Sequence, residues 1–106
     1  MNETAAVLPK LADFTGMLGQ SFRASSPGRG EFATDLVDVR VLTANEHQEN
    51  FALLFRAPAD ARAEQGIYDL STQDDEHMSL FLVPVSRDDG GLYLEAVFNN
   101  LVTTTG

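Results

Sequence analysis

The chain has 106 residues, a length that favours a single domain with one core of modest size. It contains no cysteine, which excludes disulfides, thiolate-bound zinc and a cysteine nucleophile. Acidic residues outnumber basic ones by 16 to 7, and the net charge of −9 opposes binding to nucleic acids and to anionic membranes.

The start of the chain carries neither the basic region nor the long apolar run of a signal peptide. No stretch approaches the roughly 18 apolar residues that a membrane-spanning helix needs. We therefore expect cytoplasmic synthesis and no membrane insertion. Export as part of an extracellular assembly is compatible with this expectation.

The first part of the chain predicts an arm, a short helix and a strand. Residues 1–8 are small and polar and are expected to form an arm. Residues 9–18 predict a helix whose apolar stripe consists of Leu11, Phe14 and Leu18. Gly19 suits the position that follows a helix, and the stretch "SFRA" predicts a first strand.

Residues 31–43 predict a strand in which Val37, Val39 and Val41 alternate with charged residues. Phe32 and Leu36 have the opposite parity, so we expect either a bulge near Leu36 and Val37 or a strand with two apolar faces. Two further strands are expected in "FALLFRA" and "IYDLS", separated by a loop, and an acidic turn, "TQDDE", follows them.

Residues 78–100 predict a hairpin whose turn centres on Asp89 and Gly90, with positive φ expected at the glycine. Regular pairing places one set of side chains on the core face: Phe81, Val83, Val85, Leu94, Ala96 and Phe98. The opposite face is also rich in apolar residues, and we predict it as an interaction face: Leu80, Leu82, Pro84, Tyr93 and Val97. Either the N-terminal helix or another chain is expected to cover it.

Together these elements predict one mainly β domain over residues 1–106. We expect about six antiparallel strands within residues 20–99, one helix over 9–18 and a tail over 100–106. The links are too short for the crossovers of a parallel sheet, so a bent sheet, a small barrel and a compact sandwich all fit. Pro84 lacks an N–H group, which predicts either a bulge or an edge that another chain approaches.

The sequence points to no catalytic, cofactor-binding or metal-binding residues. His47 and His77 each lie near carboxylates, as a general base would, but both fall in polar connections where charged side chains are solvated. The run from Asp74 to His77 offers ligands for a divalent ion. Adjacent residues of an extended chain nevertheless point to alternate sides, so we expect no metal site and no cofactor there.

Four motifs stand in a fixed order along the chain: "FALLFRAP", "QGIYDL", "FLVPV" and "YLEAVFN". This set resembles a family of small bacterial proteins of unknown function, in which the last motif has one residue fewer between Tyr and Glu. The resemblance implies no catalytic residues. It also implies that some relatives are encoded beside phage-tail-collar-like fibre proteins.

We therefore expect a non-catalytic structural or assembly component rather than an enzyme. Its partner would be another protein, either further copies of the chain or a fibre-like protein. We expect this assembly to be a phage-tail-derived bacterial apparatus. The alternatives are a monomeric accessory module or chaperone for a co-encoded protein and, third, a small metal-dependent enzyme.

Overall fold

The computed structural model describes residues 11–28, 30–45 and 47–101, which form one short helix and six strands. The helix is α1 (Leu11–Thr15). The strands are β1 (Ser21–Ser26), β2 (Gly30–Ala44), β3 (Gln48–Ala57), β4 (Gly66–Ser71), β5 (His77–Asp88) and β6 (Gly91–Leu101). Among the described residues, no helix has the length and apolar character needed to cross a membrane.

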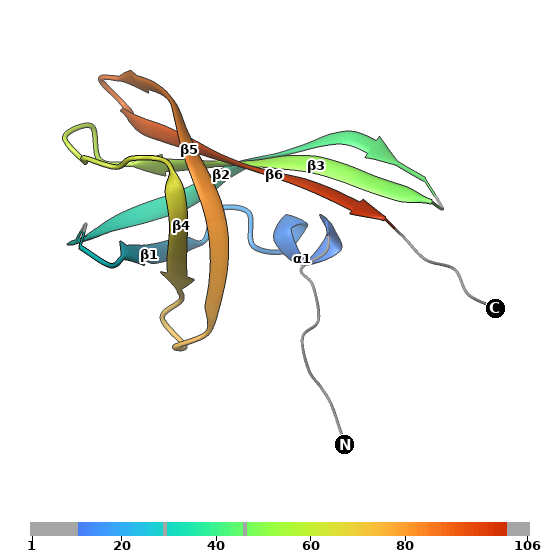
Figure 1. Ribbon diagram of the computed structural model, residues 1–106, viewed down its shortest axis with the longest axis horizontal. Coiled ribbons are helices and arrows are strands. Elements are labelled where there is room, and N and C mark those ends of the chain that lie inside the picture. The colour runs from blue at the N-terminus through green and yellow to red at the C-terminus, as the bar shows by residue number, and fades with distance from the viewer. Residues whose placement is uncertain (1–10, 29, 46, 102–106) are drawn as a thin grey trace.

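All six strands form one antiparallel sheet in the order β1-β2-β3-β6-β5-β4, and the pairing of β1 with β4 closes it into a ring. The mainly β fold of about six antiparallel strands is therefore confirmed. β2, β3 and β6 continue past the ring as a three-stranded extension with α1 beneath it, as Figure 1 shows. We call this extension the arm; it comprises residues 38–44, 48–53 and 96–101.

The interior of the ring is filled by the inward-facing residues that alternate along each strand. Phe51, Leu53 and Phe55 of β3 are fully buried. At the arm, the ring of Phe51 stacks on Phe98 of β6 at 4.8 Å, and Phe14 of α1 packs against both at 5.8 and 5.2 Å. The helix therefore closes the open end of the core.

The helix is shorter than the sequence predicted. It ends at Thr15 and is followed by a turn that runs to Gly19, where φ is +88°. Gly16 and Gly19 disfavour a longer helix because glycine has low helix propensity. Phe14 is buried as expected, but Leu18 is 53% exposed, so its place on the apolar stripe was wrong. The part of the predicted helix before Leu11, like the predicted N-terminal segment of residues 1–8 and residues 102–106 of the predicted tail, lies outside the described residues.

The predicted bulge in β2 is confirmed. The pairing of β2 with β3 shifts by one residue between Leu36 and Asp38, so Val37 is the extra residue. Because of this shift, Val39 lies across from the buried Leu53, on the same side of the sheet as Leu36. A second shift between Val41 and Thr43 follows in the arm.

The hairpin of β5 and β6 departs from the predicted pairing because β5 also contains a bulge. Val83 pairs with Glu95 and Pro84 with Leu94, but Ser86 pairs with Tyr93, which leaves Val85 without a partner on β6. One extra residue reverses the two faces of a strand relative to its neighbour. Pro84 beside the bulge is consistent with its missing N–H group.

The reversal corrects the predicted core face on β5 alone. Leu80 and Leu82 are 4% and 0% exposed and belong to the core, whereas Phe81 and Val85 are both 49% exposed. Placing Phe81, Val83 and Val85 on the core face was therefore wrong. The prediction was right for β6, where Leu94 and Ala96 are buried and Phe98 packs against the core.

The turn between the two strands has the predicted residues, Asp89 and Gly90, but positive φ occurs one residue later. Gly91 has a φ of +153°, and a Cβ atom there would come within 2.5 Å of the carbonyl oxygen of Ala57. The Asp88 carboxylate accepts the N–H groups of Gly90 and Gly91 at 2.7 and 3.1 Å. Close approach of β3 therefore requires glycine at position 91.

The register of β5 predicts effects of different size on stability for two neighbouring substitutions. Leu82→Ala should lower the free energy of unfolding by about 2–5 kcal/mol, because it leaves a cavity in the core. Phe81→Ala should lower it by about 1 kcal/mol or less, because that side chain is half exposed. Urea denaturation of both variants measures the difference, and a larger loss for Phe81→Ala would contradict this register.

Candidate functional site

The five residues predicted as an interaction face do not share one face. Leu80 and Leu82 are buried inside the ring, and Pro84 is half-buried and pairs with the core residue Leu94. Tyr93 is half-buried and Val97 is 54% exposed. The question of what covers Leu80 and Leu82 is thus answered by closure of the sheet, which packs them in the same core as Phe14 of α1.

A different set of apolar side chains lies on the outside of the sheet. We call it the outer apolar face; it consists of Ile67 of β4, Phe81 and Val83 of β5, and Val97 of β6. Ile67, Phe81 and Val97 are 59%, 49% and 54% exposed, and Val83 is half-buried. Ile67 and Phe81 are directly opposite in the β4–β5 pairing, so their side chains are neighbours.

A shallow groove of about 360 Å³ runs along this face where β5 and β6 separate. Leu80, Ala96 and Phe98 contribute to its lining from the inward-facing positions, and Phe81, Val83 and Val97 from the outward-facing ones. Ser79 and Glu95 are the polar members of the lining. The groove can therefore accept apolar groups, and Glu95 favours a positively charged group beside them.

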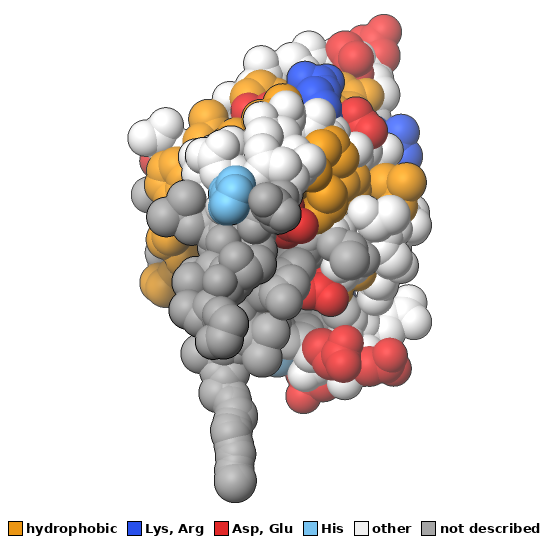
Figure 2. All heavy atoms as spheres, turned by 90° about the vertical axis from the view of Figure 1, so that its right-hand side faces the viewer, with side chains coloured by type: hydrophobic (Ala, Val, Ile, Leu, Met, Phe, Trp, Pro, Cys, Tyr) orange, Lys and Arg blue, Asp and Glu red, His pale blue; other side chains and the backbone are white. Residues whose placement is uncertain are grey.

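Carboxylates flank the outer apolar face. Glu95 faces outward opposite Val83, and Asp69 lies on β4 two residues beyond Ile67 on the same face. Figure 2 shows apolar side chains at the surface along the left-hand flank, and acidic side chains gathered at the lower right. The chain as a whole carries a charge of −9, so the surroundings of the face are electrostatically negative.

Ile67 and the outward orientation of Phe81 were both missed in the sequence. A signal for Ile67 was present, because Tyr68 and Leu70 alternate with it and are 1% and 0% exposed. No comparable signal existed for Phe81, since every residue of β5 from Leu80 to Val85 is apolar.

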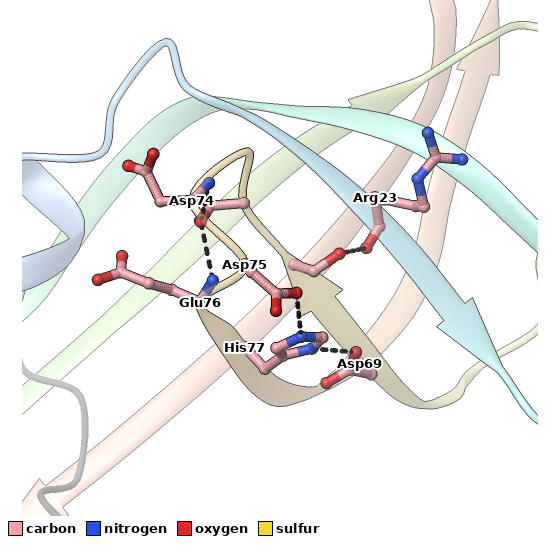
Figure 3. Close-up of polar contacts among 8 residues, drawn as sticks. Arg23, Asp69, Asp74, Asp75, Glu76 and His77 are labelled. Carbon is pink, nitrogen blue, oxygen red and sulfur yellow. Dashed lines mark hydrogen bonds and ion pairs between the residues drawn. The ribbon is translucent and has the colours of Figure 1, made fainter.

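A second candidate site is formed by His77 and the acidic turn between β4 and β5. Nδ1 of His77 lies 2.8 Å from Oδ2 of Asp69, and Nε2 lies 3.0 Å from Oδ1 of Asp75, as Figure 3 shows. The hydrogen bonds to Asp69 and then to Asp75 raise the pKa of His77 above its ordinary value of 6.5. Both ring nitrogens are occupied, which leaves neither as a free base or metal ligand in this arrangement.

The rest of the acidic turn is organised around Thr72 rather than around a ligand. The Thr72 hydroxyl accepts the N–H groups of Asp74 and Glu76, each at 3.2 Å. Asp75 has a φ of +64°, an unusual conformation for a residue other than glycine, and His77 binds its side chain. Within the described ranges, no group of three or more acidic or histidine side chains is arranged to hold a metal ion.

The other predicted polar features have local structural roles. His47 is exposed in the turn between β2 and β3, where Oδ1 of Asn45 accepts its N–H group at 2.8 Å. Oε1 of Glu49 accepts the N–H group of Leu11 at 3.0 Å and so attaches the start of α1 to β3. Ser26 of β1 pairs with Gly30 of β2 where these two antiparallel strands are joined.

Comparison with known proteins identifies a family. The profile of a protein family described as a domain of unknown function (DUF6916) matches residues 9–98. Because the match spans most of the chain, the chain belongs to this family, and the predicted resemblance is confirmed at that level. No curated protein and no solved structure matches the chain. The bacterial origin and the neighbouring fibre proteins stay predictions.

The contacts of His77 predict a pH effect with a defined sign. Because its folded-state pKa is raised, its contribution to stability is fully present below pH 6.5 and is lost as the pH rises through the raised pKa. NMR titration of the imidazole should give a midpoint above 6.5 in the unaltered protein and a lower one in Asp69→Asn.

The control is His77→Gln, whose melting temperature should lack the difference between mildly acidic and mildly alkaline pH that His77 causes. A midpoint of His77 at or below 6.5, unaffected by Asp69→Asn, would contradict the ion pairs described here.

Proposed function

We propose that this member of the DUF6916 family is a non-catalytic structural component of a protein assembly. It docks through the outer apolar face onto a partner protein whose matching surface is apolar with a basic rim. The observation that carries the proposal is the exposure of Ile67, Phe81 and Val97, each about half in water on the outside of a closed sheet. Apolar patches of this kind, rimmed by polar residues, are typical of protein-binding surfaces.

The energetics favour a docking role for these side chains. Full burial of one large aliphatic or aromatic side chain stabilises by about 1.5–3 kcal/mol, so roughly half of that remains available at each of the three positions. Together they could contribute a few kcal/mol to an interface. That is enough for an anchor but not for a complete interface, because association also costs translational and rotational freedom.

The charge distribution indicates the chemistry of the partner. Glu95 lies on the face opposite Val83, and a surface that carried a carboxylate beside it would be repelled. At the β4 end of the face, Asp69 is already paired with His77. Lysine and arginine side chains at the rim of the partner would instead complement Glu95. The partner is therefore expected to combine an apolar strip with basic borders.

The finer identity of the partner is also a proposal, and the family resemblance alone supports it. We infer a fibre-like protein, in an assembly derived from a bacterial phage tail, because some relatives are expected to be encoded beside such proteins.

The alternatives are less well supported by the geometry. A chaperone that uncovers Leu80 and Leu82 by moving its helix would have to open the core, because both side chains are packed inside the ring. A metal-dependent enzyme based on His77 would have to break one of its two contacts with Asp69 and Asp75.

Docking can be tested by site-specific photo-crosslinking in the natural host. A photoreactive phenylalanine derivative replaces Phe81, and the same group at Gln73, in the exposed β4–β5 turn, serves as the control. We expect one defined adduct from position 81 with a different protein, through a peptide that contains apolar and basic residues.

The adduct should disappear when Ile67→Glu and Val83→Glu are added, because both changes place further negative charge on the face. The proposal fails if position 81 captures no protein other than a second copy of this chain, or if both positions give the same adducts.

A further inference from the structure

The edge of β6 loses its neighbour halfway along the strand. β5 pairs with β6 only from Asp88↔Gly91 to Val83↔Glu95, whereas β3 pairs with β6 as far as Leu101. From Ala96 to Leu101, no described strand pairs with the side of β6 that faces away from β3. Figure 1 shows β6 running away from β5 along the arm. Along this length, alternate residues direct their N–H and C=O groups away from β3.

This edge lacks the features by which proteins usually prevent strands from pairing with other chains. Charged residues, prolines and bulges are the common protections. The sequence has no charged residue and no proline after Glu95, and the pairing of β6 with β3 is continuous without a register shift. The unpaired part of β6 is therefore regular and uncharged.

The opposite edge of the arm, formed by β2, provides a contrast within the same molecule. It carries the charged residues Asp38 and Arg40, and two register shifts interrupt its pairing with β3. One edge of the arm is thus protected and the other is open. An unprotected strand edge that has no partner promotes aggregation. The difference between the two edges therefore indicates that the β6 edge binds a partner strand.

We propose that two copies of the chain pair through this edge, β6 against β6, in antiparallel orientation between Ala96 and Leu101. The two arms then form one continuous sheet around a twofold axis near Phe98 and Asn99. This inference goes beyond the docking of a partner onto the outer apolar face, because it concerns the edge of β6, which shares only Val97 with that face.

The charges explain why a second copy fits this edge in particular. Each copy carries −9, so most orientations of two copies bring carboxylates together. The stretch from Ala96 to the end of the chain is the one long uncharged segment of β6 and its tail, so pairing there opposes no like charges. A twofold axis also makes the contact self-complementary, which limits the assembly to a closed dimer.

The geometry specifies which side chains meet. An axis perpendicular to the sheet keeps each face on its own side, so outward-facing Val97 and Asn99 meet outward-facing residues of the second copy. Residues of equal parity then lie opposite, and Asn99 of one copy lies directly across or diagonally from Asn99 of the other. The exposed side chain of Asn99 is therefore a sensitive position for charge.

Sedimentation over a wide range of protein concentration tests the pairing. The unaltered chain should change from 11.5 kDa to twice that mass as its concentration rises. Asn99→Lys and Asn99→Asp should each raise the dimer dissociation constant at least about tenfold, because like charges meet across the axis. An equal mixture of the two variants should dimerise again, because opposite charges then meet. Gln73→Lys makes the same charge change in the exposed β4–β5 turn and should leave the dimer unchanged.

Three results would overturn the inference. The first is an unaltered chain that stays monomeric at every concentration. This holds equally if the amides from Ala96 to Leu101 in that monomer are protected from hydrogen exchange by other segments of the same chain. The second is a dimer that both Asn99 variants leave intact. The third is a mixture of Asn99→Lys and Asn99→Asp that stays monomeric.

Discussion

One extra residue in β5 determines what this protein presents to its surroundings. Because Val85 has no partner on β6, the two faces of β5 are reversed relative to a regular hairpin. Leu80 and Leu82 consequently complete the core, and Phe81 is left at the surface beside Ile67. The outer apolar face is thus a consequence of backbone register rather than of composition, since every residue from Leu80 to Val85 is apolar.

Closure of the sheet gives this register its stability. The pairing of β1 with β4 converts six strands into a ring, and the ring buries a continuous core that a single open layer would leave exposed on one side. The strands that are too long for the ring form the arm, whose inner aromatic side chains are covered by Phe14 of α1. A short helix is sufficient there, because it has only one end of the core to close.

Much of this fold was predictable from side-chain alternation, which requires only that each strand be considered alone. The bulge of β2 followed from that pattern because the exposed residues Asp38 and Arg40 mark the outward positions of that strand. β5 has no such markers, and a one-residue bulge leaves the alternation on either side of it intact. Pro84 indicated that β5 is irregular, but not which of its side chains face the core. The predicted interaction face therefore combined buried and exposed residues. The pairing of β1 with β4 is a long-range contact that neither strand encodes alone.

The docking surface depends most directly on the orientation of β5, because it exists only if Phe81 and Val83 face outward. Nuclear Overhauser contacts across the hairpin measure this register in solution. The structure predicts backbone contacts between Val83 and Glu95 and between Ser86 and Tyr93, with none that place Val85 directly opposite Leu94. Contacts of Val83 with Ala96 and of Val85 with Leu94 would instead show a regular hairpin, and would contradict the account.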